Sequence, residues 1–89
     1  MTYLTIHHAV EDFARWKARY DAHSGARQAA GLHQEHLFRG ADKPNEVTLL
    51  FRLDDVARAK AFAESPELRK RMSEAGVVGK PEIRYLEEG

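Results

Sequence analysis

The 89-residue sequence contains no cysteine, and this absence removes several kinds of chemistry. A chain without thiols has no disulfide framework, no cysteine nucleophile and no thiolate-ligated metal site. The sequence also lacks an excess of charge of one sign, because 14 lysines and arginines balance 14 aspartates and glutamates. Nucleic acids and anionic membranes usually attract proteins with a basic excess. We therefore expect neither nucleic acid nor a membrane as a partner.

Long apolar runs and familiar catalytic motifs are missing as well. No stretch approaches the roughly 20 apolar residues that a membrane-spanning helix needs. Residues 1–4 show no basic region followed by an apolar run, so we expect a cytoplasmic protein. The sequence holds no GxSxG, no HExxH and no glycine-rich phosphate loop. The run 69–71 is basic, but glutamates on the same helix balance it, which is typical of a solvated face.

Length and composition predict one small folded domain over residues 1–89. Hydrophobic residues make up 43% of the chain and charged residues 31%, which is the range of globular proteins. A chain this short buries only about 60–65% of its unfolded surface. Association is the readiest source of additional stability for such a domain. We therefore expect a homodimer.

The hydrophobic pattern predicts six elements along the chain. Alternating or strongly apolar runs indicate strands at 3–8, 32–39, 46–53 and 82–86. Apolar residues at three- and four-residue steps indicate a helix over 11–30, with Arg19 pointing away from its buried face. A second helix begins after Asp54 or Asp55, restarts at Ser65 and Pro66, and ends at Gly76.

The order strand, helix, strand, strand, helix, strand predicts a ferredoxin-like α+β fold. Right-handed crossovers place both helices on one face of a four-stranded antiparallel sheet. The other face stays uncovered, and Leu50 and Leu86 make it partly apolar. A second copy of the chain is the simplest cover, with Arg52 pairing across the interface with an acid such as Glu35 or Glu82.

Several segments together resemble a known group of proteins. They are residues 8–16, 42–47, 65–68, 75–77 and 81–83. The chain resembles a small, uncharacterised branch of the dimeric α/β-barrel superfamily, which includes the antibiotic biosynthesis monooxygenases. The resemblance implies two ferredoxin-like subunits packed sheet against sheet, with a cavity between the sheet and the helices of each subunit.

The resemblance does not imply a single reaction. The superfamily includes cofactor-independent oxygenases of polyketide phenols, haem-degrading enzymes, isomerases, polyketide cyclases and members without known catalysis. The Asn-Trp-Trp arrangement of the phenol oxygenases and haem-degrading members is missing here. The only tryptophan is Trp16, and the only asparagine, Asn45, lies in a turn.

His8 is the candidate catalytic residue. It ends a strand on which Leu4 and Ile6 face the helices, so we expect it at the rim of the cavity. An imidazole there, with a pKa near neutrality, can act as general base on an acidic phenol or enol. The alternative is structural: His8 hydrogen-bonds the start of the first helix and fixes that turn.

Six further side chains are predicted to shape the pocket, of which five are aromatic: Phe13, Trp16, Tyr20, His36, Phe62 and Tyr85. Trp16 and Tyr20 lie one turn apart on a helix, an arrangement that also fits simple core packing. Strand alternation predicts that His36 shares the helix-facing side with Gln34 and Phe38. Its alternative is a half-exposed strand residue.

The five histidines do not predict a metal site. His7 and His8 are adjacent on a strand, so they point to opposite faces, and His33 and His36 do the same because their separation is odd. We therefore expect no metal and no cofactor. The predicted function is binding of a small organic molecule, with cofactor-independent monooxygenase or cyclase-like chemistry on an aromatic or polyketide-type substrate. The alternative is a non-catalytic ligand-binding or structural homodimer.

Overall fold

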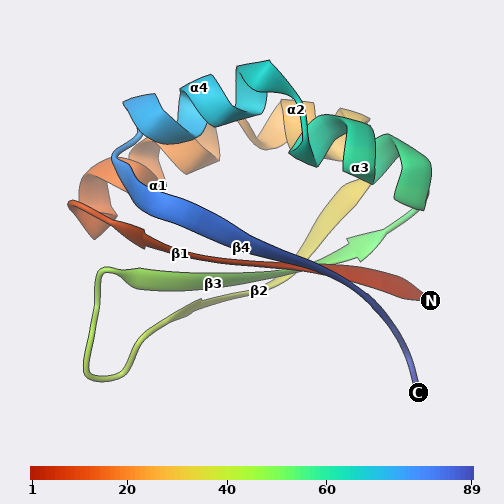
Figure 1. Ribbon diagram of the computed structural model, residues 1–89, viewed down its shortest axis with the longest axis horizontal. Coiled ribbons are helices and arrows are strands. Elements are labelled where there is room, and N and C mark those ends of the chain that lie inside the picture. The colour runs from red at the N-terminus through yellow and green to blue at the C-terminus, as the bar shows by residue number, and fades with distance from the viewer.

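The computed structural model describes residues 1–89, which form four helices on one face of a four-stranded antiparallel sheet (Figure 1). Along the chain the elements are β1 (Thr2–Val10), α1 (Phe13–Ala22), α2 (Ser24–Ala29), β2 (Leu32–Arg39), β3 (Glu46–Leu53), α3 (Val56–Ala63), α4 (Pro66–Glu74) and β4 (Val77–Glu87). The strands lie in the order β2-β3-β1-β4. This arrangement confirms the predicted ferredoxin-like α+β fold, with each predicted helix divided in two.

Short polar side chains begin three of the helices. Asp12 accepts a hydrogen bond from the Arg15 amide before α1, and Asp55 accepts one from the Arg58 amide before α3. Ser65 caps α4 in the same way, with Pro66 in the first turn, where its missing N–H costs nothing. None of the helices is long and apolar enough to cross a membrane.

Glycines end the helical segments as the sequence predicts. Gly31 follows α2 with a φ of 79°, and Gly76 follows α4 with a φ of 87°. Only glycine adopts this left-handed conformation without a steric penalty, which lets the chain turn back into the sheet.

β4 is longer than predicted and begins at Val77 instead of residue 82. Pro81 suggests an interruption there, but β4 lies at the edge of the sheet, where a missing N–H is tolerated. The pairing of β1 with β4 shifts between His7 and Ala9, which absorbs the irregularity around Gly79.

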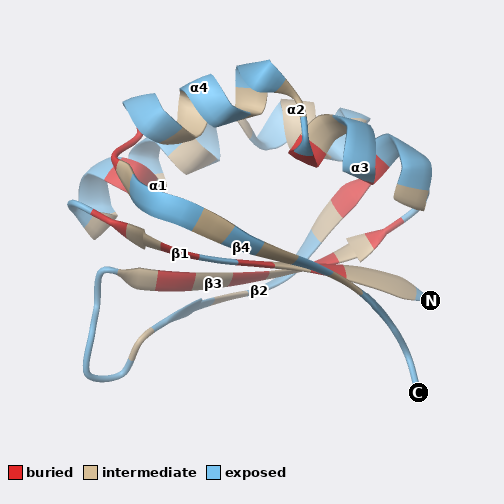
Figure 2. Cartoon of the chain, in the orientation of Figure 1, coloured by how far each residue is buried: buried red, intermediate tan, exposed pale blue.

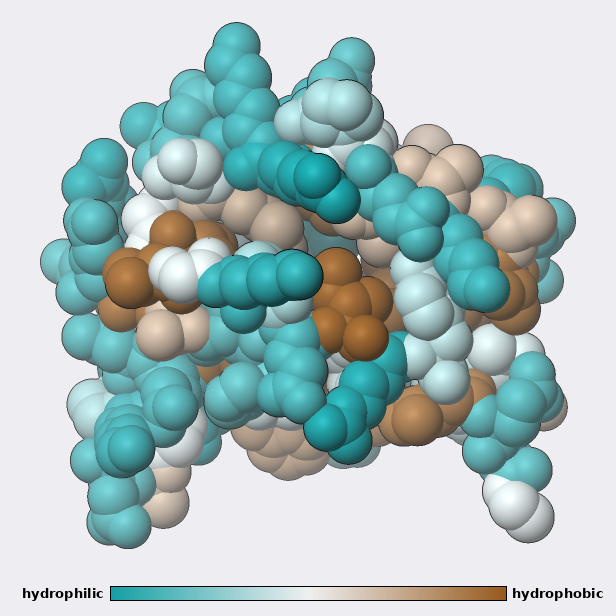
Figure 3. Space-filling view, in the orientation of Figure 1, coloured by the Kyte–Doolittle hydropathy of each residue, from teal (hydrophilic) through white to brown (hydrophobic).

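The core lies between the sheet and the helices. Burial along β3 alternates strictly, so that Val47, Leu49, Phe51 and Leu53 are buried and their neighbours are partly exposed. Figure 2 shows the same alternation along β1 and β3. Figure 3 shows apolar side chains reaching the surface between the helix layer and the sheet, within a mostly hydrophilic exterior.

A bulge in β2 overturns the prediction for His36. Gln34 pairs with Phe51, but His36 already pairs with Leu50, so the side-chain alternation reverses between them. His36 therefore lies on the face of the sheet away from the helices, where its ring stacks on Phe38 at 5.3 Å. Strict alternation fails here because one extra residue moves every later side chain to the other face.

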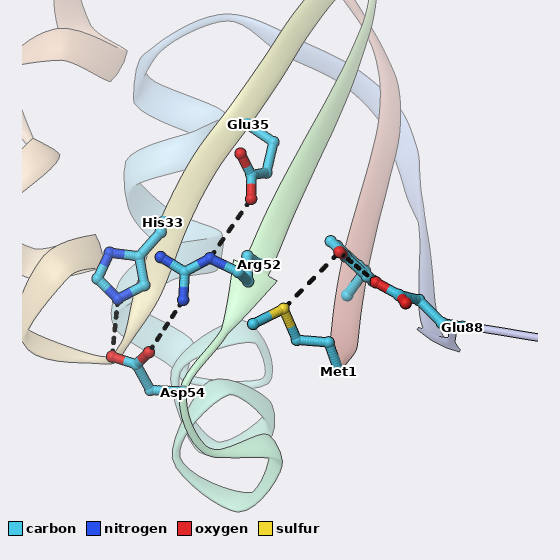
Figure 4. Close-up of polar contacts among 7 residues, drawn as sticks. Met1, His33, Glu35, Arg52, Asp54 and Glu88 are labelled. Atoms are coloured by element: carbon cyan, nitrogen blue, oxygen red, sulfur yellow. Dashed lines mark hydrogen bonds and ion pairs between the residues drawn. The ribbon is translucent and has the colours of Figure 1, made fainter.

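The outer face of the sheet combines apolar and charged groups. Phe38 is 52% exposed and Leu86 is 42% exposed. Figure 4 shows a polar cluster on strands β2 and β3, in which Arg52 lies 3.4 Å from Glu35 and 3.6 Å from Asp54. The Arg52–Glu35 pair thus forms within one chain, whereas the sequence suggested it across an interface.

Candidate functional site

A cavity of about 60 Å³ lies between the sheet and the helices. Ten of the fifteen residues that line it are hydrophobic. Ile6, Leu49 and Phe51 form its floor, because the inner positions of β1 and β3 are apolar. The helices supply the remaining walls, with Trp16 and Tyr20 from α1, Phe62 from α3, and Leu68 and Met72 from α4.

Two stacked aromatic rings form one wall of the cavity. Trp16 and Tyr20 stack with ring centroids 4.8 Å apart, and Trp16 is only 3% exposed. The Tyr20 hydroxyl donates a hydrogen bond of 2.5 Å to Gln34 Oε1 on β2. Burial raises the pKa of Tyr20 to about 12. Tyr20 is therefore protonated at neutral pH, and its hydroxyl proton is already committed to Gln34.

His8 lines the same cavity and is almost fully buried. Its ring meets Trp16 edge-on, with centroids 5.4 Å apart, and its side chain is 4% exposed. Nδ1 is buried without a hydrogen-bond partner. Burial, helped by the charge of His7, lowers the pKa of His8 to about 4. The expectation of a pKa near neutrality is wrong, because water that would solvate the charged form cannot reach the ring.

The structure brings together four of the predicted site residues, namely His8, Trp16, Tyr20 and Phe62. Phe13 lies beside them, 5.8 Å from Trp16, but under the Arg39 guanidinium and outside the cavity lining. Tyr85 also packs against the core without lining the cavity, and its buried hydroxyl has no partner. His36 lies on the opposite face of the sheet.

Sequence reasoning missed four basic residues in the cavity lining, which are Arg19, His23, Arg27 and Arg71. Arg19, His23 and Arg27 recur every four residues, the spacing of one helix face, and this signal was available in the sequence. The sequence pattern predicts that Arg71 belongs to a solvated basic run. The structure instead places it partly buried at the cavity, while Arg69 on the same helix is exposed.

No group of three or more histidine, aspartate or glutamate side chains is arranged to hold a metal ion. His33 contacts Asp54 at 2.7 Å, and His7 lies 3.9 Å from Glu46, each on the outer face. The side chains at the cavity therefore offer hydrogen bonds, positive charge and apolar surface.

The fold and the cavity define a ferredoxin-like α+β protein with a mostly apolar cavity beneath its helices. No protein-family model and no curated protein matches the sequence. Solved structures do match over nearly the whole chain. A protein from Bordetella bronchiseptica, provisionally described as an antibiotic biosynthesis monooxygenase, is 17% identical with a TM-score of 0.78, covering 99% of this chain and 97% of its own.

Two further structures agree. A protein from Caulobacter crescentus CB15 with the same provisional description is 14% identical, with a TM-score of 0.73 and coverage of 99% and 89%. An uncharacterized NIPSNAP domain protein from Burkholderia xenovorans is 11% identical, with a TM-score of 0.70 and coverage of 100% and 95%. The chain thus has the fold of the antibiotic biosynthesis monooxygenase-like proteins, as the sequence resemblance implies.

Proposed function

We propose that this protein binds a small organic molecule in the cavity beside His8 and acts on it as a cofactor-independent monooxygenase or cyclase-like enzyme. The substrate class is an aromatic or polyketide-type compound. The observation that carries the proposal is the His8 ring, which is buried against apolar walls with an unpaired Nδ1. A buried polar atom without a partner costs stability, and service to a ligand or a reaction is one physical reason to retain it.

The neutral state of His8 defines what it can do. With a pKa of about 4, the ring is uncharged at neutral pH and can accept a proton or a hydrogen bond from a bound hydroxyl. An acidic phenol or enol that transfers its proton to His8 leaves an anion beside the imidazolium, and this charge raises the histidine pKa in the complex. His8 therefore becomes a stronger base only when the substrate is bound.

An enolate or phenolate formed in this way can react with dioxygen. In the balanced reaction, an activated CH₂ group becomes a carbonyl, one oxygen atom enters the product and the other leaves as water with the two hydrogens. In the cyclase-like case the same anion attacks a carbonyl carbon of the substrate. Both reactions need the proton transfer that this proposal assigns to His8.

The size of the cavity sets a condition on binding. Its volume of about 60 Å³ is smaller than the roughly 150 Å³ of an apolar cavity that accepts benzene. A ring can enter only if a wall moves. Tyr20 and the Arg27 guanidinium, which lies 3.5 Å over the Tyr20 ring, form a wall that is partly buried.

We also propose that the protein is a homodimer that joins through the outer face of the sheet. Phe38, Val78 and Leu86 are each at least 42% exposed, and Phe38 and Leu86 lie on that face. A second copy would remove this apolar surface from water. Native mass spectrometry tests the assembly, and a monomer at micromolar concentration would contradict it.

Oxygen consumption with a hydroxylated anthrone tests the catalytic proposal. We expect turnover by the wild-type protein and a loss of at least about 100-fold in His8→Ala, the scale of general-base catalysis. Arg69→Gln is the control, because Arg69 is exposed on α4, outside the cavity lining and away from the proposed interface. Equal rates for wild type and His8→Ala would refute the role of His8.

The alternative is a non-catalytic ligand-binding or structural dimer. The observation in its favour concerns Tyr20, which carries the only hydroxyl among the residues that line the cavity. Its proton is committed to Gln34, so His8 has no second proton-transfer group beside it. Ligand binding that shifts Trp16 fluorescence without any turnover supports this alternative.

A further inference from the structure

Every non-hydrophobic side chain that lines the cavity belongs to a basic residue type. These residues are His8, Arg19, His23, Arg27 and Arg71. No aspartate or glutamate lines the cavity, although the chain as a whole carries 14 of each sign of charge. Positive charge is therefore concentrated at this cavity by the fold and not by the composition.

The three arginines at the cavity have no carboxylate partner. The structure contains six ion pairs, and Arg19, Arg27 and Arg71 take part in none of them. Asp21, whose charge acts on Arg27, is held by Lys17 at 2.7 Å on the exposed side of α1. Arg27 and Arg71 are partly buried, whereas Arg19 is exposed. A partly buried guanidinium without an anion has lost solvation without gaining a charge partner.

Arg27 shows this most clearly. Its Nη1 donates a 2.7 Å hydrogen bond to the Tyr20 carbonyl, and its Cζ lies 3.5 Å from the centre of the Tyr20 ring. Burial lowers the pKa of Arg27, against the opposing influence of Tyr20 and Asp21. One hydrogen bond leaves most of the five guanidinium donors of Arg27 without a protein partner.

Apart from His8, the basic residues at the cavity all come from the helix layer or its junctions. Arg19 comes from α1, His23 from the junction of α1 and α2, Arg27 from α2, and Arg71 from α4. The floor, formed by the strands, is apolar apart from His8. A ligand that fits this polarity has an apolar body and a negatively charged group at one end.

We propose that the cavity selects a small organic carboxylate, with its apolar body against Trp16 and Phe62 and its carboxylate held by Arg27 and Arg71. This inference rests on the proposed function, because it names the class of molecule that enters the same cavity. Arginine is suited to the task because its planar fork binds a carboxylate through two parallel hydrogen bonds. A neutral ligand would leave the guanidinium groups unpaired.

Benzoate and benzyl alcohol form a suitable probe pair, since they share a ring and differ in charge. Binding is followed by the fluorescence of Trp16, the only tryptophan, and by calorimetry at constant salt. We expect benzoate to bind at least tenfold more tightly than benzyl alcohol, the scale of a charge-assisted hydrogen bond.

Arg71→Gln is the decisive variant, because the Arg71 side chain makes no hydrogen bond or ion pair within the chain. Arg69→Gln on the same helix is its matched control, being exposed and outside the cavity lining. We expect Arg71→Gln and Arg27→Gln to weaken benzoate binding about tenfold and to change benzyl alcohol binding less than twofold. Arg69→Gln should leave both affinities unchanged.

Three results would overturn the inference. Equal binding of both probes, insensitive to the arginine variants, would refute carboxylate selection and leave the proposed ligand-binding function in place. An equal loss in Arg69→Gln would show a general charge effect instead of a site. Absence of binding by either probe would refute the carboxylate inference and count against the proposed function itself.

Discussion

The buried His8 ring predicts how stability depends on pH. In the unfolded chain its pKa is about 6.5, whereas burial lowers it to about 4 in the folded protein. Between these values the unfolded state binds more protons, so acid favours unfolding. The contribution of the neutral His8 ring to the free energy of unfolding is fully present above pH 6.5, and it falls as the pH is lowered toward 4.

The expected magnitude follows from the two pKa values. Linkage gives a loss of about 2 kcal/mol between pH 7 and pH 5 from this one group. His8→Leu removes the titration together with the unpaired Nδ1, so its free energy of unfolding at pH 7 should lie within about 1 kcal/mol of wild type. As the pH falls below 6.5, the free energy of unfolding of wild type should decrease more steeply than that of His8→Leu, so that the variant becomes the more stable protein.

Urea unfolding at fixed protein concentration, repeated from pH 7 to pH 5, measures this difference. Arg69→Gln is the control, because Arg69 is exposed on α4, away from His8 and from the proposed interface. Asp54, whose pKa is lowered mainly by its hydrogen bond from His33, titrates below this window. Parallel pH curves for wild type and His8→Leu would refute the placement of a desolvated, unpaired imidazole in the core.

Three other perturbations test separate parts of the structure. Trp16→Ala should cost about 3–5 kcal/mol of unfolding free energy, since the ring is 3% exposed, and a loss below 1 kcal/mol would contradict its place in the core. Asp55→Ala should cost about 1 kcal/mol by removing the cap of α3, whereas Asp42→Ala in the exposed turn should cost little. Leu86→Glu should shift the protein to monomer in light-scattering measurements, and an unchanged dimer would refute the sheet-face interface.

The fold was predictable because local signals agreed with one another. Asp12, Asp55 and Ser65 marked helix starts, Gly31 and Gly76 marked helix ends, and the alternation of β3 marked its buried face. Each signal acts within a few residues, so the sequence alone carries it.

The errors arose where neighbouring elements decide the outcome. The bulge that turns His36 outward depends on how β2 pairs with β3, and the edge position that tolerates Pro81 depends on the sheet order. Arg19 and Arg71 reach the cavity because α1 and α4, which are far apart in the sequence, both contribute to its walls. The low pKa of His8 likewise follows from packing around the strand end, which its residue type does not reveal.

The central claim is that a small organic molecule binds beside His8 inside the cavity. Titration of isotope-labelled protein with benzoate, followed by NMR, tests it most directly because the single Trp16 indole N–H gives one resolved reporter. We predict saturable shifts at Trp16, His8 and neighbouring cavity residues, with outer-face residues such as His36 unmoved. Shifts confined to the outer face, or none at millimolar benzoate, would contradict the claim.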